Sequence, residues 1–156
     1  MMPEWKIRPA VETDVPVIVS LIRALAEYEK ALPGAVSITE DLLSEALFGA
    51  RPSVEALVAS VGSEMAGYAL FFHNFSSWRG RRGMYLEDLF VRPEMRGRGV
   101  GKALLDEVTR IARERNCARV EWVVVDWNSP AIDFYKSLGA EPVDGWTLYR
   151  MEVREE

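Results

Sequence analysis

The spacing of apolar side chains along the chain predicts four helices. Apolar residues recur every three to four positions in four stretches, which is the repeat of a helix that buries one face. Thr13-Asp14 and Thr39 precede the first two stretches and are suited to cap them, and Gly139 is suited to end the last. The predicted helices cover residues 13–30, a segment that begins at residue 39, residues 100–115 and residues 130–138.

Other segments are rich in β-branched and aromatic residues and predict strands. Gly62-Ser63-Glu64 is suited to a hairpin turn, and a longer polar connection covers residues 76–83. The run 118–125 is almost continuously apolar, which predicts a strand buried on both faces. The predicted strands cover residues 5–8, 54–61, 65–75, 84–91, 118–125 and 146–153.

The order of these elements is β-αα-βββ-α-β-α-β. This order predicts an α/β fold in which helices flank a mixed β-sheet. The chain has 156 residues, the size of a single domain, and no internal repeat, linker or low-complexity segment divides it. We therefore expect one domain over residues 1–156.

The composition narrows the partners and the location of the protein. The chain is 49% hydrophobic with a net charge of −5, so no overall basic field would attract nucleic acid. The N-terminus lacks the order of a signal peptide, and no apolar run approaches the length of about 18 residues that spans a membrane. Cys117 is the only cysteine and cannot form an internal disulfide. These features predict a cytoplasmic protein with neither a nucleic-acid nor a membrane partner.

His73 is the only histidine, and it lies in an apolar strand without a motif that would make it a nucleophile's base or a metal ligand. We expect it to be structural or to line a surface. The sequence therefore predicts no metal site.

Three alternating glycines, Gly97, Gly99 and Gly101, separate the fourth predicted strand from the third helix. The first amides of a helix have no partner and lie at the positive end of its dipole, and glycines let the backbone approach an anion closely. The basic residues of this segment are Arg92, Arg96, Arg98 and Lys102. The turn therefore predicts a phosphate-binding site.

The spacing excludes two familiar phosphate-binding turns. In the dinucleotide motif G-x-G-x-x-G the third glycine would come one residue later. In a nucleotide-triphosphate loop four residues would separate the glycines and Ser or Thr would follow Lys102, where this chain has Ala103.

Two groups of residues could carry chemistry. Glu87 and Asp88 are adjacent carboxylates in an apolar strand, and regular alternation would send them to opposite faces, one of which should meet a site. Structural carboxylates satisfied by an amide or an arginine are the equal alternative. Tyr135 shares a helix face with Ala131 and Leu138, and by this pattern alone it is a half-buried core tyrosine.

Two motifs change this interpretation. The run Arg96-Gly97-Arg98-Gly99-Val100-Gly101 resembles the R-x-x-G-x-G/A signature of the GNAT superfamily of N-acetyltransferases. The segment from Asn128 to Gly139 resembles the later N-x-x-A-x-x-F-Y-x-x-x-G motif of the same superfamily, and the predicted order of elements is also that of its fold. Several further segments, such as 85–91, 126–130 and 133–136, resemble the spermidine/spermine (diamine) and thialysine acetyltransferase branch.

The resemblance implies acetyl-CoA as co-substrate and a set of site residues. It implies that the backbone of Leu89, Phe90 and Val91 meets the pantetheine arm, and that Asn128 and Pro130 line its thiol end. It implies Tyr135 as the general acid that protonates the leaving thiolate, and we choose Glu87 as the base, acting through water. The pyrophosphate would be held by Arg96, Gly97, Arg98, Gly99, Val100, Gly101 and Lys102, and the amine would meet Tyr28, Glu29, Glu87 and Asp88, with Trp78 near its outer end.

The expected reaction is acetyl transfer to a primary amine by direct attack in a ternary complex, because no activated Cys or Ser is evident. A pocket edged by Glu29, Glu87 and Asp88 would favour a diamine, polyamine or lysine-like substrate with a second positive charge. Arg79, Arg81 and Arg82 would repel a long polyamine and favour thialysine or another amino acid. The superfamily resemblance also implies a homodimer.

Other functions stay open at this point. The chain could be a binding module that senses acyl-CoA without turnover, with Tyr135 only a wall residue. It could also acetylate a protein or a different small amine.

Overall fold

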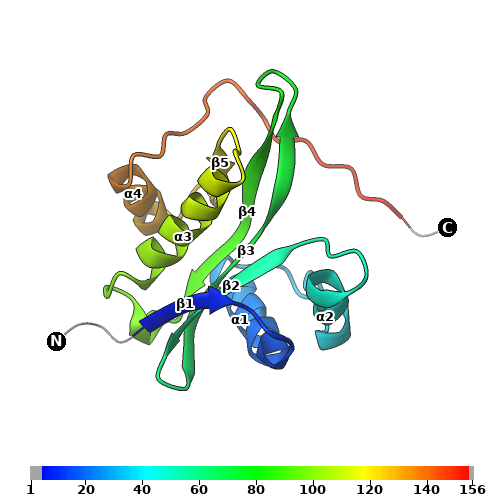
Figure 1. The fold of residues 1–156 in the computed structure, drawn as a ribbon, viewed down its shortest axis with the longest axis vertical. Coiled ribbons are helices and arrows are strands. Elements are labelled where there is room, and N and C mark those ends of the chain that lie inside the picture. The colour runs from blue at the N-terminus through cyan, green and yellow to red at the C-terminus, as the bar shows by residue number, and fades with distance from the viewer. Residues whose placement is uncertain (1–4, 155–156) are drawn as a thin grey trace. The chain divides into compact units, whose positions relative to one another are not determined.

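The computed structural model describes residues 5–154 (Figure 1). They form two compact units, one that ends at Val123 and one that begins at Val124. The first unit contains β1 (Trp5–Pro9), a 3-10 turn (Glu12–Asp14), α1 (Val15–Tyr28), α2 (Glu40–Phe48), β2 (Glu55–Val61), β3 (Glu64–Ser76), β4 (Arg81–Val91), a second 3-10 turn (Pro93–Met95), α3 (Val100–Glu114) and β5 (Val120–Glu121). The second contains α4 (Ser129–Ser137).

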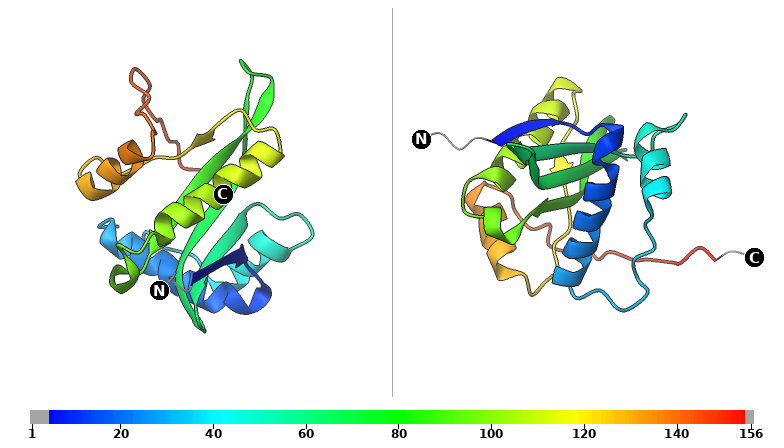
Figure 2. Two further views of the ribbon diagram at one scale, coloured as in Figure 1. Left: turned by 60° about the vertical axis from the view of Figure 1, so that its left-hand side comes forward. Right: turned by 90° about the horizontal axis from the view of Figure 1, so that it is seen from below.

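The five strands of the first unit form one mixed sheet in the order β1-β2-β3-β4-β5. The first three pairings are antiparallel and the pairing of β4 with β5 is parallel. Helices α1 and α2 cover one face of the sheet and α3 covers the other (Figure 2). This confirms the prediction of a mixed sheet with flanking helices.

Each face of the sheet buries its own apolar layer. Helix α3 contributes Leu104, Leu105, Val108 and Ala112, which recur at helical spacing and are all buried. The layer under α1 and α2 consists of Val15, Ile18, Val19, Leu21, Leu43, Leu47, Ala56, Val58, Met65, Tyr68, Leu70 and Phe90. Because both faces are covered, the central strands are apolar on both sides.

A β-bulge interrupts the pairing of β3 with β4 at Glu87. Leu70 pairs with Asp88 and the next residue, Phe71, pairs with Leu86, so Glu87 is an extra residue opposite Leu70. In such a bulge two residues of one strand oppose one residue of its partner. The prediction that alternation sends Glu87 and Asp88 to opposite faces is therefore wrong, since both occupy the place opposite Leu70, whose side chain belongs to the layer under α1 and α2.

The helix caps follow the sequence in one case and not in another. Thr39 caps α2 as predicted, since its Oγ1 accepts a hydrogen bond from the amide of Leu42 at 3.1 Å. Asp14 does not cap α1 with its side chain. Its carboxylate instead accepts hydrogen bonds from the Arg8 guanidinium at 2.7 and 3.0 Å and from the Val11 amide at 2.8 Å. A guanidinium and an amide of the preceding turn thus take the acceptor that the cap would need.

Two predicted strands are largely absent. Of residues 118–125 only Val120 and Glu121 pair, with Met84 and Tyr85 of β4, and none of the eight is buried. Residues 146–153 contain no strand and their side chains are exposed. A strand needs a hydrogen-bonded neighbour, and among residues 5–154 no strand pairs with residues 146–153. The apolar run therefore overpredicted the first strand and the alternation overpredicted the second.

In the second unit, α4 ends in the way that its sequence predicts. Gly139 has φ +90°, and its amide donates to the carbonyl of Lys136 while the amide of Ala140 donates to that of Tyr135. This is the Schellman arrangement, which glycine favours because it adopts positive φ without strain.

No helix among residues 5–154 is long and apolar enough to cross a membrane.

The bulge predicts how β4 responds to deletions. Removal of Glu87 restores regular alternation and keeps Leu86 and Asp88 on their faces, so we expect the free energy of unfolding to fall by about 1 kcal/mol or less. Removal of Tyr85 from the same strand is the control. It forces Met84 or Leu86, both buried, off its face, which costs on the order of 1.5–3 kcal/mol for one side chain. Urea unfolding measures both, and equal losses would contradict the bulge.

Candidate active site

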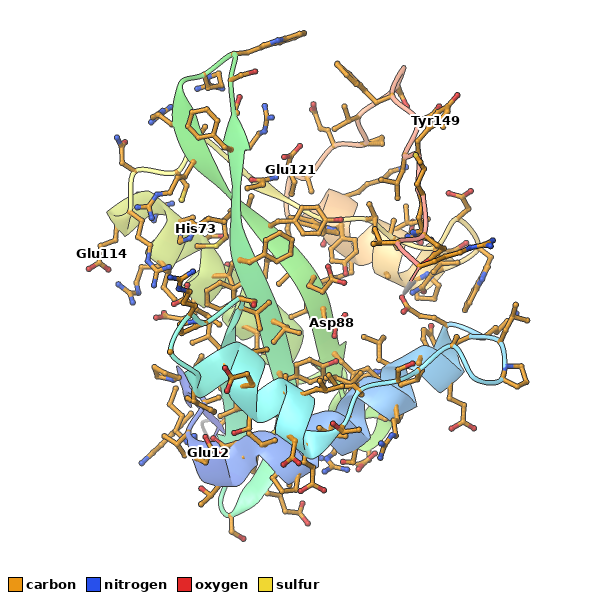
Figure 3. All side chains as sticks on the ribbon, turned by 90° about the vertical axis from the view of Figure 1, so that its right-hand side faces the viewer. Glu12, His73, Asp88, Glu114, Glu121 and Tyr149 are labelled. Atoms are coloured by element: carbon orange, nitrogen blue, oxygen red, sulfur yellow. The ribbon has the colours of Figure 1, made fainter. Side chains whose placement is uncertain are left out.

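Three carboxylates interact at the bulge. Asp88 accepts a hydrogen bond from the hydroxyl of Tyr68 at 2.9 Å. The charges of Glu87 and Glu29 both act on Asp88 and on Tyr68, which places the end of α1 within electrostatic reach of β4. Figure 3 shows Asp88 midway along the β3–β4 ribbon. The structure therefore brings together Glu29, Glu87 and Asp88 of the predicted amine-binding set.

Burial and repulsion both change the ionisation of this cluster. Desolvation raises the pKa of Asp88 to about 6, the Tyr68 hydroxyl opposes this shift, and Glu87 and Glu29 add to it. Desolvation also raises the pKa of Glu29. Among residues 5–154, none of the ion pairs with Lys or Arg involves Glu29, Glu87 or Asp88. The cluster is thus a negative site in which Asp88 is half-buried and Glu29 and Glu87 are exposed, and a bound cation would neutralise its charges.

The other two predicted amine-binding residues lie in different places. Tyr28 is the last residue of α1, next to Glu29, and its ring centroid lies 5.2 Å from the Arg96 guanidinium. Trp78 lies in the turn between β3 and β4 and is 87% exposed. From Glu87 to Arg81, where β4 begins, the ribbon extends for about 20 Å at roughly 3.3 Å per residue. The first unit therefore brings Tyr28 to the carboxylates but does not bring Trp78 to them.

The glycine turn has the geometry of an anion site. Gly97 and Gly99 adopt φ +78° and +83°, and α3 begins at Val100 without a side-chain cap. Among residues 5–154, no hydrogen bond joins a backbone amide from Gly97 to Gly101 to a backbone carbonyl outside α3. A Cβ on Gly97 would meet open space, so the positive φ and not crowding requires glycine there. The turn fits the pyrophosphate of acetyl-CoA.

The basic side chains of the turn are used in different ways. Lys102 pairs with Asp106 at 2.7 Å and both are exposed. Arg96 donates from Nε to the carbonyl of Val91 at 2.9 Å and lies over two aromatic rings. Arg98 is exposed.

The end of β4 offers backbone groups to a ligand. On one side Leu89, Phe90 and Val91 pair with Ala69, Tyr68 and Gly67 of β3. On the other side β5 pairs only with Met84 and Tyr85, so within the described chain no strand covers that edge from Leu86 to Val91. From the resemblance to the GNAT superfamily we expect the pantetheine arm at this edge, along Leu89, Phe90 and Val91.

In the second unit, the predicted residues lie on α4 and at its start. Asn128 is buried, and its Oδ1 caps the helix by accepting from the amide of Ala131 at 3.3 Å. Pro130 lies in the first turn, where its missing amide donor costs nothing. Tyr135 is half-buried, with its ring 5.5 Å from that of Phe134. Both ends of the helix that carries Tyr135 are therefore fixed locally.

Sequence reasoning missed two features. Tyr68 gave no signal, because an aromatic residue in an apolar strand is typical of a core, yet it holds Asp88. The second is a bidentate ion pair between Arg115 and Glu55 at 2.6 and 2.8 Å, with His73 Nε2 3.4 Å from Arg115. Burial and the charges of Arg82 and Arg115 lower the pKa of His73.

No group of metal-ligating side chains is present among residues 5–154.

The structure thus combines an α/β sheet with a glycine turn before α3 and a group of carboxylates at the bulge of β4. The chain belongs to the acetyltransferase (GNAT) family, which matches residues 21–140. It is 40% identical to the thialysine N-epsilon-acetyltransferase of Bos taurus over 94% of this chain and 91% of that protein. It is 31% identical to an L-ornithine N5-acetyltransferase of Arabidopsis thaliana over 94% of this chain and 83% of that one.

Solved structures agree in fold. An integron cassette protein of V. cholerae superposes with a TM-score of 0.79 at 27% identity, covering 96% of this chain and 93% of that one. An aminoglycoside acetyltransferase from a soil metagenome, in complex with sisomicin, gives a TM-score of 0.77 at 20% identity, with 96% and 97% covered.

These comparisons confirm the predicted GNAT fold and the resemblance to the thialysine and polyamine branch. The chain is an N-acetyltransferase, and the alternative of a binding module without turnover is not favoured, because the curated relatives are named as enzymes. Acetyltransferases of this family generally use acetyl-CoA as co-substrate.

The raised pKa of Asp88 predicts that ionisation of this carboxyl lowers the free energy of unfolding. The folded protein binds this proton more tightly than the unfolded chain, so the contribution of Asp88 to stability is full below pH 3.8 and is lost as the pH rises through about 6. Asp88→Asn keeps an acceptor for Tyr68 and removes the charge. We expect it to raise the free energy of unfolding at pH 7.5 by on the order of 1–3 kcal/mol, and to change it little at pH 3.5.

Denaturant unfolding at the two pH values measures this difference. A destabilised Asp88→Asn variant at pH 7.5 would contradict a costly buried charge at this position.

Proposed function

We propose that the protein transfers the acetyl group of acetyl-CoA to a primary amine of a small substrate with a second positive charge, such as thialysine, a lysine-like amino acid or a diamine. The observation that carries this proposal is the group of Glu29, Glu87 and Asp88 at the bulge, none of which has a basic partner among the described residues. Opposite-charge contacts in a partly buried site favour a dication over a monocation by on the order of 1–3 kcal/mol. The names of the thialysine and ornithine acetyltransferases support the same class of acceptor.

The co-substrate is held by backbone more than by side chains. The amides of residues 96–102 and the positive end of α3 receive the pyrophosphate, with Arg98 and Lys102 adding positive charge. The open edge of β4 at Leu89, Phe90 and Val91 receives the pantetheine arm, and Asn128 and Pro130 are assigned to its thiol end. Acetyl-CoA supplies an acetyl group activated as a thioester.

Glu87 removes the proton from the acceptor. An alkylammonium with a pKa near 10.4 is only about 0.1% neutral at pH 7.4, a deficit of roughly 4 kcal/mol. Glu87 is the exposed member of the bulge and can reach a bound amine through water. Asp88 and Glu29 bind the second positive charge of the substrate. The neutral amine attacks the thioester directly, since no described residue is placed as an activated nucleophile.

Tyr135 is the general acid. It would donate its hydroxyl proton to the thiolate sulfur as the carbon–sulfur bond breaks. The attacking nitrogen then loses its second proton, through water, to the ionised tyrosine, which restores the phenol and leaves the neutral amide. This role rests on the motif of α4, whose caps hold the tyrosine in a defined orientation on its own helix.

The contacts of the β3–β4 turn support only a small part for this turn in selecting the acceptor. Arg81 donates to Asn116 Oδ1 at 3.0 Å and Arg82 donates to the Arg115 carbonyl at 3.4 Å, so both are engaged at the end of α3. They and Trp78 lie at the far end of the ribbon, roughly 16 Å or more from Glu87 along the strand. A short acceptor such as thialysine or a diamine is selected at the carboxylates alone, and Trp78 would meet only a longer amine.

We also propose, by resemblance to the family, that the protein acts as a cytoplasmic homodimer. Light scattering at working concentration measures the mass, and a monomer would refute the dimer.

Tyr135→Phe tests the acid. The change removes one oxygen and little volume, so a packing role predicts nearly unchanged turnover. As the acid, Tyr135 predicts a fall in kcat of about a hundredfold or more with acetyl-CoA affinity nearly intact. Steady-state kinetics and calorimetry give the two quantities, and equal turnover would return Tyr135 to a structural role.

Selectivity among acceptors tests the carboxylate cluster. We expect kcat/KM to be at least tenfold higher for thialysine or a short diamine than for a monoamine of equal length, and Glu29→Gln to reduce this preference. Glu27→Gln, an exposed carboxylate in the same last turn of α1, is the matched control and should leave the preference unchanged. If the monoamine reacts equally well and Glu29→Gln has no effect, the assignment of the acceptor fails.

A further inference from the structure

Arg96 joins the glycine turn to the end of α1. Its side chain leaves the turn just after the 3-10 turn Pro93–Met95, and its Nε donates to the carbonyl of Val91, the last residue of β4, at 2.9 Å. Its guanidinium carbon lies 5.2 Å from the ring centroid of Tyr28 and 5.5 Å from that of Phe90. Two aromatic rings and one carbonyl therefore hold a single cation.

The partners of Arg96 differ in burial. Phe90 is buried in the sheet and Val91 is fixed by pairing with Gly67, so both belong to the rigid core. Tyr28 is exposed and ends α1, after which Lys30 turns the chain at φ +61°. Arg96 thus links the exposed last turn of α1 to the buried sheet.

That last turn carries Glu29, whose carboxylate acts on Asp88 and Tyr68. Three backbone hydrogen bonds close this turn. The amides of Glu29, Lys30 and Ala31 donate to the carbonyls of Leu25 at 2.9 Å, Glu27 at 3.0 Å and Ala26 at 2.9 Å, respectively. The orientation of Glu29 toward the bulge therefore depends on how this turn is held.

We propose that Arg96 is a positioning residue for the acceptor amine, because its side chain holds Tyr28 and with it Glu29 beside the bulge. Its backbone still belongs to the phosphate-binding turn, but its guanidinium serves the amine side. This inference rests on the proposed function for its kinetic consequence and on the contacts alone for its structural one.

Kinetics separate this role from that of a phosphate ligand. Arg96→Met keeps much of the length and removes the charge and the donor. Loss of two cation–π contacts predicts a rise of about five- to thirtyfold in KM for the amine at saturating acetyl-CoA, with kcat and the acetyl-CoA dissociation constant each within about twofold.

Arg96→Lys restores a cation near the rings and should recover most of the loss. Arg98→Met, two residues away, should show the opposite division, with weaker acetyl-CoA binding and an unchanged amine KM.

Hydrogen exchange tests the structural link without any activity. In the unliganded protein, Arg96→Met should speed exchange of the Glu29, Lys30 and Ala31 amides about fivefold or more, and Arg98→Met should not. If no amine is acetylated, the proposed function fails while this measurement still decides the link. A loss of acetyl-CoA affinity of tenfold or more in Arg96→Met, with unchanged amine KM and unchanged exchange, would overturn the proposal.

Discussion

The extra residue at Glu87 is the constraint on which the amine site depends. A regular strand would place one carboxylate under α1 and α2 and the other under α3. Because the bulge puts Glu87 and Asp88 opposite the single residue Leu70, both charges meet at one place, where Glu29 also acts. The cost is a carboxylate whose pKa is raised to about 6, held by one tyrosine hydroxyl. A bound cation would offset this cost, and the proposed acceptor amine is such a cation.

The sequence alone predicts most of the first unit. Helices α1, α2 and α3 follow from their apolar stripes, the β2–β3 hairpin from Gly62-Ser63, and the phosphate-binding turn from the alternating glycines before Val100. These features depend on local chemistry: a cap, a positive φ or one buried face. The two motifs add the family, which periodicity cannot supply, because the same α/β order serves many functions.

Features that depend on distant partners could not be predicted in this way. Nothing local distinguishes Glu87 as the bulged residue, since the bulge is defined by its register with β3. Asp14 has the composition of a cap, yet Arg8 and the Val11 amide take its oxygens. Residues 146–153 alternate as a strand does, but a ladder requires a neighbour that the sequence does not identify. The same holds for Arg96, whose motif implies a phosphate while its guanidinium contacts the rings of Tyr28 and Phe90.

The central claim is that this chain moves an acetyl group from acetyl-CoA to a short dicationic amine. The most direct measurement incubates the protein with acetyl-CoA, with and without thialysine or a short diamine, and follows free thiol together with the mass of the amine. We expect thiol release that requires the amine, and a product that gains one acetyl group for each thiol released. Tight binding of CoA with no amine-dependent release across the panel would contradict it.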